Sequence, residues 1–296
     1  MNTDCDPTRN CPICQHVSTG EKLPYPTIPN RNSSLIFEYI TSCSNCGLAW
    51  AEPVASQMEL DAFYSAGDYW DTLIPESSIQ RVHESCQAKN RVLLCKAFLE
   101  NQELKILDIG AGHGFISSWC DELPKNSVVQ YDFIEPDTDK RDEILQRSTN
   151  FTVNTKTSLD SCNDKYDLIF LNHVLEHVED PVVFLNEVKS VLNKGGLLYI
   201  EVPHNDHLHK LDVFPHTLFF NINSLAKIAT QLGLEIVSTQ SFGSNNQGVL
   251  NRCISQLNKA AVYFKLEKLQ HYFDAKQWEY NKSSVNGIWL NIILKA

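Results

Sequence analysis

The segment that most constrains the fold is residues 106–114, Ile-Leu-Asp-Ile-Gly-Ala-Gly-His-Gly. It begins with apolar residues typical of a buried strand and ends in glycines at alternate positions, Gly110, Gly112 and Gly114. Glycine has no Cβ, so it permits a sharp turn from a strand into a helix and lets a ligand approach the backbone amides at the helix start. The segment therefore predicts a nucleotide-like ligand at a strand-to-helix turn.

Two nearby residues indicate which nucleotide to expect. The dinucleotide fingerprint Gly-x-Gly-x-x-Gly needs glycine at position 115, where this chain has Phe115, so an NAD site is disfavoured. Asp108 lies two residues ahead of the first glycine. Its negative charge suits the ammonium group of a zwitterionic ligand better than a pyrophosphate. We therefore expect a ligand that carries an amino acid.

Strand-like runs alternate with helical patterns along the rest of the chain. This alternation predicts parallel strands joined by right-handed crossovers, in a sheet that helices cover on both faces. A run of Asn-Lys-Gly-Gly at 193–196 is expected to end the helix before it. The expected elements are strands at 128–134, 166–172, 197–203, 235–242 and 287–296, and helices at 183–192 and 251–275.

An ordered set of motifs accompanies these elements. Glu135 ends the strand at 128–134, where an acidic residue binds ribose hydroxyls through charge-assisted hydrogen bonds. His-Val-Leu-Glu-His-Val-Glu-Asp-Pro follows at 173–181. With the glycine segment, this order resembles the class I S-adenosylmethionine-dependent methyltransferases over residues 87–296. The resemblance implies an α/β fold, with a Rossmann-like sheet of seven strands whose last strand is antiparallel.

The same resemblance implies an enzyme that transfers a methyl group from S-adenosylmethionine to a small-molecule acceptor, such as a sugar, a nucleotide-sugar or a secondary metabolite. Ser158 and Leu159 are implied to lie near the adenine ring. The expected cofactor-binding set is Asp108, Gly110, Gly112, Gly114, Glu135, Ser158, Leu159 and Asn172. The alternative is a protein without catalysis that binds S-adenosylmethionine, or that uses zinc to interact with a partner.

Two cysteine pairs near the N-terminus have the spacing of metal-binding knuckles. Cys11 and Cys14 form one Cys-x-x-Cys pair, and Cys43 and Cys46 form the other. Each pair presents two thiolates to one tetrahedral ion, so the two pairs together complete the shell of a structural zinc site with no open position for chemistry. Disulfides or a redox pair are the alternatives.

The predicted zinc site also indicates how the chain is divided into domains. Gly47 gives the backbone freedom to turn after the second pair, whereas Gln15 holds the matching place after the first. The segment after the second pair resembles the lead-in of a methyltransferase subfamily with an N-terminal zinc-binding module. The expected parts are a zinc-binding module at 1–52, a helical linker or lid at 53–86 and the methyltransferase domain at 87–296.

Histidines are concentrated after the strand at 166–172: His173, His177, His204, His207, His209 and His216. Residues at the carboxyl ends of parallel strands lie beside the ligand pocket, and a neutral histidine there suits removal of a proton from the acceptor. We expect His216 as the catalytic base, because its segment resembles a histidine-containing lid of the family. His173 is the second candidate, and His177 is expected to be structural.

Two metal alternatives involve the same histidines. His-x-x-Glu-His at 173–177 matches an inverted zinc-protease motif, but it begins at a strand end within the ordered methyltransferase segments. His204, His207 and His209 offer ligand atoms for a catalytic metal, but no matching set of carboxylates accompanies them. A loop that contacts the acceptor is the preferred interpretation.

Composition limits the partners. The formal net charge of −11 argues against nucleic acid, because binding to phosphates requires a basic surface. The apolar runs are shorter than a membrane span, and the N-terminus lacks an apolar signal core. We therefore expect a cytoplasmic protein that binds no nucleic acid and no membrane, while the sequence leaves its oligomeric state open.

Overall fold

The computed structural model describes most of the chain in separate segments. The described residues are 10–17, 22–29, 33–65, 78–100, 103–125, 127–147, 149–242, 257 and 287–296. The helical stretch expected at 251–275 lies outside them except for Leu257. Among the helices within these segments, none is long and apolar enough to cross a membrane.

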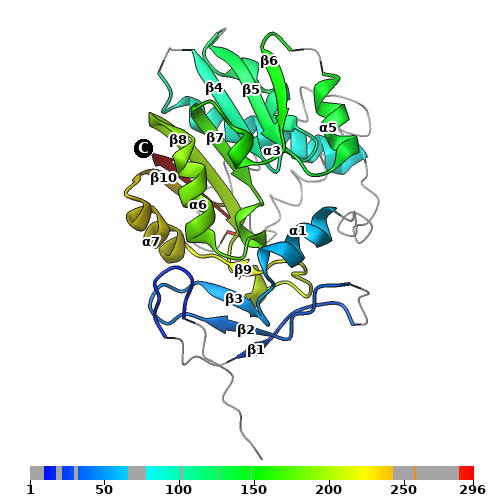
Figure 1. Cartoon of the computed structure of the whole chain (residues 1–296), viewed down its shortest axis with the longest axis vertical. Helices are drawn as coiled ribbons and strands as arrows, with labels where there is room; N and C mark the ends of the chain where they lie inside the picture. Colours follow the sequence, from blue (N-terminus) through cyan, green and yellow to red (C-terminus); the bar gives the residue numbers. More distant parts are fainter. Residues whose placement is uncertain are drawn as a thin grey trace, which may run out of the picture.

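A seven-stranded sheet forms the centre of the larger part (Figure 1). The strand order is β10-β11-β8-β7-β4-β5-β6, and the five strands from β8 to β6 run parallel. β11 is antiparallel to both of its neighbours, as expected for the last strand. The strands are β4 (Leu104–Ile109), β5 (Val128–Ile134), β6 (Thr152–Lys156), β7 (Tyr166–Asn172), β8 (Leu192–Pro203), β10 (Glu235–Phe242) and β11 (Trp289–Lys295). The predicted α/β fold is confirmed.

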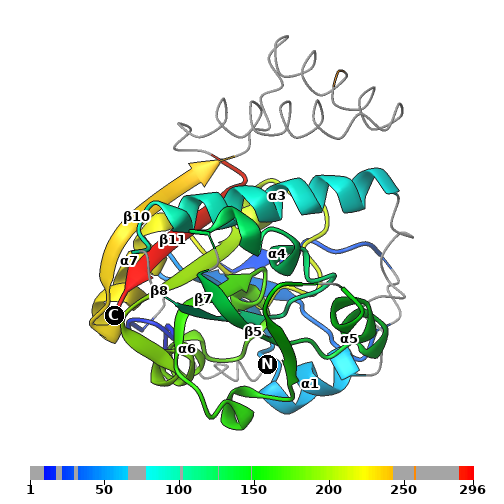
Figure 2. The ribbon, with the colours of Figure 1, turned by 90° about the horizontal axis from the view of Figure 1, so that it is seen from above.

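Helices cover both faces of this sheet (Figure 2). Leu107 and Ile109 of β4 pack in one core cluster with α6 (Pro181–Ser190) and α7 (Ile222–Leu232), whereas Ile106 belongs to the cluster on the opposite face. This alternation follows from the two-residue period of a strand. The helices of the opposite face are α3 (Ser78–Lys96), α4 (Phe115–Ser118) and α5 (Thr138–Leu145). Short 3-10 turns complete this part: η1 (Cys120–Glu122), η2 (Leu159–Ser161), η3 (Leu175–His177) and η4 (Asp206–Leu208).

The predicted end of α6 is wrong. The helix ends at Ser190, and residues 193–196, which were expected to cap it, lie within β8. Two backbone contacts explain the difference. The amide of Gly195 donates to the carbonyl of Ala296 at 2.9 Å, and the amide of Ala296 donates to the carbonyl of Gly196 at 3.1 Å. The chain end thus supplies sheet partners that a helix-stop pattern does not reveal.

A second, smaller sheet lies beside the large one (Figure 1). Its order is β1 (Leu23–Pro24), β2 (Tyr39–Ser42), β3 (Ala49–Glu52) and β9 (Leu218–Phe219), and all pairs are antiparallel. α1 (Gln57–Ser65) follows it. The chain therefore completes the N-terminal sheet with β9, a strand from the C-terminal half that begins two residues after His216.

Candidate functional site

The carboxyl ends of the parallel strands form one rim, and the predicted donor-binding residues lie along it. The amide of Gly110, just after β4, donates to the carbonyl of Ile134 at the end of β5 at 2.8 Å. On the other side β4 pairs with β7, whose last residue is Asn172. The glycine loop, Glu135 and Asn172 are therefore brought to the same edge of the sheet, as the sequence predicts.

The glycines of the loop have the backbone conformation that only glycine adopts easily. Gly110, Gly112 and Gly114 all have positive φ, at 69°, 55° and 63°. A Cβ on Gly110 would lie 2.5 Å from Cγ2 of Val174, whereas a Cβ on Gly112 would meet no atom within 4 Å. Gly110 thus allows close packing of the loop, whereas Gly112 borders open space.

Asp108 is a buried carboxylate with one satisfied oxygen. Its side chain is 1% exposed, and Tyr131 donates its hydroxyl to Oδ2 at 2.6 Å. Oδ1 has no hydrogen-bond partner among the described residues. Burial raises the pKa of Asp108 to about 7, although the Tyr131 hydrogen bond and the charge of Arg91 act in the opposite direction. Such a group gains from a cationic ligand, because an unpaired buried charge is costly.

The side chain of Glu135 lies against the glycine loop that follows β4. Its Oε2 accepts from the amide of Gly112 at 2.6 Å, and its Oε1 accepts from the amide of Asp137 at 2.9 Å. Burial raises the pKa of Glu135, against the effect of these two amides. Each carboxylate oxygen can accept a second hydrogen bond, so the side chain keeps acceptor capacity for a pair of hydroxyls.

The remaining predicted donor residues lie farther along the rim. Ser158 is the N-terminal cap of η2 and accepts from the backbone of Ser161. Leu159 is partly buried and packs against the core cluster of α6 and α7. Asn172 ends β7, and its buried Oδ1 finds no hydrogen-bond partner in the described part of the chain. These three positions stay predictions for binding, with geometry compatible with it.

An arginine that the sequence analysis missed supports the glycine loop. Arg147, just after α5, donates to the carbonyls of His113 and Gly114, and its Nη2 lies 3.1 Å from Oε1 of Glu143. Glu143 also lies 2.8 Å from Nδ1 of His113. Arg147 carries no motif of its own, so only the tertiary contact reveals its role.

A second group of polar side chains lies at η3, next to the glycine loop. Glu176, His177 and His216 bring ligand-type atoms within 4.8 Å of one another. The hydroxyl of Tyr64 lies 2.7 Å from Nδ1 of His177, and Oδ2 of Asp206 lies 2.9 Å from Nδ1 of His216. Burial lowers the pKa of His177 to about 3, despite the nearby Glu176 charge. We call these five residues the rim cluster.

The cluster is fixed by backbone contacts across the fold. The amide of Thr217 donates to the carbonyl of Glu176 at 2.8 Å, and its hydroxyl donates to the carbonyl of Val178 at 3.0 Å. The amide of His177 donates to the carbonyl of Val174, the residue that packs on Gly110. The predicted base His216 is therefore held at the same rim as the predicted donor site.

His173, the second predicted base, occupies a different electrostatic environment. Its Nδ1 lies 3.2 Å from Oε1 of Glu176, and its Nε2 lies 3.3 Å from Oε1 of Glu201. Burial lowers the pKa of His173, but the two carboxylates outweigh it and raise that pKa to about 9. Glu201 also forms a buried pair with Arg91. His173 thus favours its protonated form, whereas a base must begin neutral.

The histidines at 204, 207 and 209 do not converge. His204 is buried, with Nδ1 2.8 Å from the carbonyl of Gly287, and His207 packs against Phe219 with ring centroids 4.8 Å apart. His209 is exposed. They form no group of ligand atoms within the described segments, so the geometry gives no support to a metal at this position.

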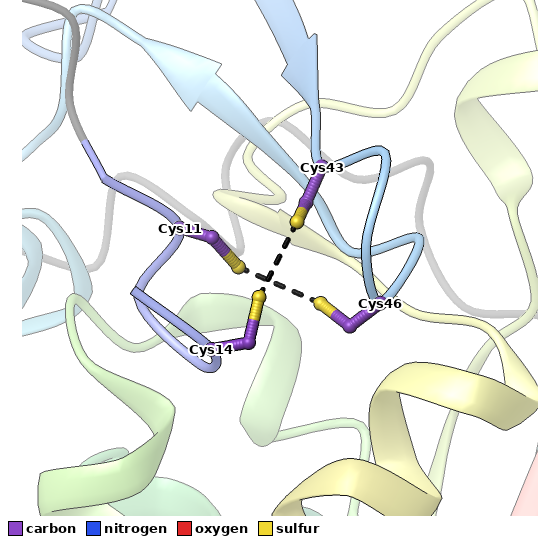
Figure 3. Close-up of side chains that lie close together, drawn as sticks. All are labelled: Cys11, Cys14, Cys43 and Cys46. Atoms are coloured by element: carbon purple, nitrogen blue, oxygen red, sulfur yellow. Dashed lines mark hydrogen bonds between the residues drawn. The ribbon is translucent and has the colours of Figure 1, made fainter. Parts of the chain in front are cut away.

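The four predicted zinc-binding cysteines do converge (Figure 3). The sulfurs of Cys11 and Cys46 lie 3.5 Å apart, and those of Cys14 and Cys43 lie 3.4 Å apart. A tetrahedral zinc ion with bonds of about 2.3 Å would place its sulfurs roughly 3.8 Å apart, so this set fits the ion with small adjustments. All four cysteines are free thiols, not disulfides.

The two knuckles have the same backbone hydrogen bonds. The amide of Gln15 donates to the carbonyl of Cys11, and the amide of Gly47 donates to the carbonyl of Cys43, both at 2.9 Å. Gln15 has a φ of 56° and Gly47 a φ of 75°, so glutamine adopts the left-handed conformation that glycine supplies in the second knuckle. The departure from glycine noted in the sequence leaves the knuckle geometry intact.

The cysteine cluster packs directly against the larger part. The side chain of Asn221, which caps α7, donates to the carbonyl of Gly47 at 2.8 Å, and that of Gln231 donates to the carbonyl of Ile13 at 2.6 Å. Cys11 and Leu225 of α7 belong to the same core cluster. The N-terminal module is therefore tied to the larger part of the fold through α7.

Comparison with known proteins gives a consistent result. The family model described as "Methyltransferase domain" matches residues 80–239. The tRNA U34 carboxymethyltransferase of Campylobacter hominis is 26% identical over 147 residues, which cover 46% of this chain and 49% of that protein. The ubiquinone biosynthesis O-methyltransferase of Bartonella tribocorum is 27% identical over 161 residues, covering 49% of this chain and 62% of that protein.

A solved structure shows the same fold at low identity. The S-adenosylmethionine-dependent methyltransferase from Leishmania major superposes with a TM-score of 0.50 at 16% identity, over 79% of this chain and 82% of that one. The chain spans about half the length of the first curated relative that it matches.

Proposed function

The chain belongs to the methyltransferase-domain family, and from that premise we propose that it transfers a methyl group from S-adenosylmethionine to a small-molecule acceptor. The observation that carries the proposal is the state of Asp108. This carboxylate is buried beneath a bare glycine loop, and its Oδ1 has no hydrogen-bond partner among the described residues. An ammonium group would supply the missing partner, and S-adenosylmethionine carries one.

The donor would be held by three kinds of contact. Asp108 would bind the ammonium group, and the remaining acceptor positions of Glu135 would bind the ribose hydroxyls. Gly112, with open space where a Cβ would stand, would let the ligand approach the backbone. Bound there, S-adenosylmethionine supplies an activated methyl group, and the protein's task is to align the acceptor with it.

A residue of the rim cluster would take up the proton that the acceptor loses. Oδ2 of Asp206 lies 2.9 Å from Nδ1 of His216, at ion-pair distance but without hydrogen-bond geometry, and the contact leaves Nε2 to accept a proton. We therefore keep His216 as the proposed base. His173 remains the second candidate, although its two carboxylate neighbours favour the form that has already taken up a proton.

A small molecule is the proposed acceptor class. The net charge of −11 disfavours a polyanionic substrate, because each phosphate contact needs a compensating basic group. The named activities of the relatives, on tRNA U34 and in ubiquinone biosynthesis, belong to those proteins. A transfer RNA therefore serves as the contrasting acceptor in the test.

We also propose that Cys11, Cys14, Cys43 and Cys46 hold a structural zinc ion. Four converging thiols on two matched knuckles leave no coordination position for a substrate, so the ion would stabilise the fold without taking part in methyl transfer. On this proposal residues 1–52 form the zinc module, 53–86 the linker and 87–296 the methyltransferase domain.

Calorimetry with S-adenosylhomocysteine tests the donor site. Zinc-loaded protein is expected to bind it, whereas Asp108→Asn should lower the affinity by roughly one to two orders of magnitude, because a hydrogen bond to a charged group contributes about 1.5–3 kcal/mol. Absence of binding to the folded wild-type protein would overturn the proposal. The protein is then incubated with S-adenosylmethionine and either a panel of hydroxylated small molecules or tRNA. Formation of S-adenosylhomocysteine with a small molecule, but not with tRNA, would identify the acceptor class.

A further inference from the structure

We propose that Glu176, His177 and His216 form a binding site for one divalent transition-metal cation, separate from the four-cysteine site. Metal binding by this triad stands on its own geometry. Its role in activating the acceptor rests on the proposed function, because the triad lies in the acceptor half of that site.

The three side chains come from two distant segments and converge. Glu176 and His177 lie on η3, whereas His216 lies just before β9. One ligand atom from each lies within 4.8 Å of the other two, and Nε2 of His177 is 4.0 Å from Oε1 of Glu176. A tetrahedral ion with bonds of about 2.1 Å would place its ligand atoms roughly 3.4 Å apart, so side-chain rotations of up to about 1.4 Å would be needed to bring the three atoms onto one cation.

Each histidine of the triad has a polar side chain close to Nδ1. Metal-bound histidine almost always has its second ring nitrogen against a carboxylate, a carbonyl or another polar group, which fixes the orientation of the ring. Here Tyr64 lies at Nδ1 of His177 and Asp206 lies at Nδ1 of His216. The proposed ligand atom of each histidine is therefore Nε2, the other ring nitrogen.

Glu176 provides the anionic ligand and has an unused oxygen. The side chain is 1% exposed, and Oε1 lies between His173 and His177. Oε2 is buried and has no hydrogen-bond donor in the described part of the chain. A buried carboxylate oxygen without a donor is costly, and a cation at this position would satisfy it.

The backbone of the site is rigid enough to keep the ligands together. Thr217 is hydrogen-bonded to the carbonyls of Glu176 and Val178, which ties the segment of His216 to η3. Tyr25 donates its hydroxyl to the carbonyl of His216 at 2.9 Å from the opposite side. The triad therefore resembles a pre-formed site rather than a chance encounter of mobile side chains.

The ligand set selects the class of metal. Two imidazoles and one carboxylate suit zinc, iron, cobalt or manganese in the divalent state, whereas magnesium and calcium prefer oxygen ligands only. Three protein ligands leave coordination positions open. The oxygen of an acceptor hydroxyl would take one of them, and the cation would lower its pKa.

The metal changes the proposed role of His216. In the metal-loaded protein the acceptor proton passes to water, the acceptor oxygen bonds to the methyl carbon, and the sulfur keeps the electron pair of the broken carbon–sulfur bond. His216 then acts as a ligand and holds the cation. Its role as a base applies only to the protein without a metal at this site.

Cobalt titration of the full chain tests the site. Protein whose cysteine site already holds zinc is titrated with Co²⁺, and the visible absorption bands report nitrogen and oxygen ligands, whereas thiolate ligands add a sulfur-to-cobalt charge-transfer band. We expect one equivalent of Co²⁺ without that band. His216→Ala and Glu176→Gln should each weaken binding by at least about tenfold, and Asp206→Asn by about tenfold while keeping all three ligand atoms.

A matched variant and a second ligand make the outcome decisive. His209→Ala removes an exposed histidine near Asp206 and should bind Co²⁺ as the wild type does. Wild-type protein that takes up no Co²⁺ at nitrogen and oxygen ligands, or equal affinity in His216→Ala, Asp206→Asn and wild type, overturns the site. S-adenosylhomocysteine binding is measured on the same samples. Protein that binds Co²⁺ but not S-adenosylhomocysteine overturns the proposed function alone. Protein that binds S-adenosylhomocysteine but not Co²⁺ overturns the metal site alone.

Discussion

The hydroxyl of Tyr25 donates a hydrogen bond to the backbone carbonyl of His216, 2.9 Å away, and so joins the N-terminal sheet to the rim cluster. The pairing of β3 with β9 reinforces this link, because β9 begins two residues after His216. The amide of Ala51 also donates to the carbonyl of Thr217 at 2.8 Å. The cysteine module thus supports one side of the rim cluster.

Tyr25→Phe tests this link with the smallest change available. Loss of the hydroxyl should lower the free energy of unfolding by about 1 kcal/mol, the net contribution of one hydrogen bond. Urea denaturation gives the value. Tyr39→Phe is the control, because Tyr39 is exposed in the same sheet and should change stability little. Equal effects of the two substitutions would show that the Tyr25 contact contributes nothing specific.

If the four cysteines hold the proposed zinc ion, replacement of one of them should release it and loosen the module. For Cys43→Ser we expect metal analysis to fall from about one zinc per chain to near zero, with a lower melting temperature and faster proteolysis within residues 1–52, because metal binding is coupled to folding. Cys162→Ser, at a half-buried cysteine outside the cluster, should retain the zinc. Full zinc content in Cys43→Ser would contradict the four-thiolate assignment.

Binding of S-adenosylhomocysteine should depend on pH through Asp108. The pKa of this carboxyl is about 7 in the folded protein, so below that pH the free site is largely protonated. A cationic ammonium requires the ionised form, so binding at about pH 6 should release close to one proton, and affinity should fall about tenfold per pH unit below 7. Calorimetry in two buffers of different ionisation enthalpy measures the proton, and Asp108→Asn should abolish the dependence.

The raised pKa of Asp108 also makes the free energy of unfolding depend on pH. This free energy should fall as the pH rises, whereas the affinity for the ligand should increase. The pKa in the folded state lies above the ordinary value of 3.8, so the folded chain binds the proton more tightly than the unfolded chain does. The contribution of Asp108 to stability is therefore full below about pH 4 and is lost as the pH rises to about 7. Asp108→Asn should flatten this part of the stability profile, measured by urea unfolding across the pH window.

The buried pair of Arg91 and Glu201 predicts a large and asymmetric mutational effect. Nη2 of Arg91 lies 2.5 Å from Oε1 of Glu201, and the side chains are 9% and 1% exposed. Arg91→Met leaves a buried carboxylate without its partner and should cost about 3 kcal/mol, whereas the double variant with Glu201→Gln should recover part of the loss. Lys22→Ala breaks the salt bridge between Lys22, whose side chain is 44% exposed, and Glu52, whose side chain is 16% exposed, and should cost less than about 1 kcal/mol.

Loss of the His216 side chain should lower turnover without weakening binding at the methyl-donor site. Once an acceptor is identified, His216→Ala should lower kcat by roughly 10²–10⁴-fold, the range of general acid–base catalysis, while S-adenosylhomocysteine binds as in the wild type. Asp206→Asn should have a smaller effect in the same direction. Unchanged kcat in His216→Ala would remove this histidine from both proposed roles.

The sequence was sufficient to predict those structural features that are formed by a single short segment of the chain. The glycine loop, the strands around it and the two cysteine knuckles each follow from adjacent residues, because a turn or a strand is set by conformational preference and short-range burial. The pattern Ser-Gln-Met-Glu at 56–59 likewise predicts a capping box at the start of a short helix, and Oε2 of Glu59 accepts from the amide of Ser56 at 2.8 Å, just before α1. In the spacer between the two cysteine pairs, the sequence predicts a strand at 35–40, whereas the structure has β2 at 39–42, because pairing with β1 and β3 sets its bounds.

The sequence by itself determined the fold class, the placement of the glycine loop and Glu135 at one edge of the sheet, and the four converging cysteines, since each is specified by motifs of a few neighbouring residues in a fixed order. Only the tertiary structure decided that Tyr64, Glu176, His177, Asp206 and His216 form one cluster, and that His173 lies between two carboxylates. These contacts join residues far apart in the chain. Their geometry depends on how β9 and η3 pack together, and no local pattern encodes that packing.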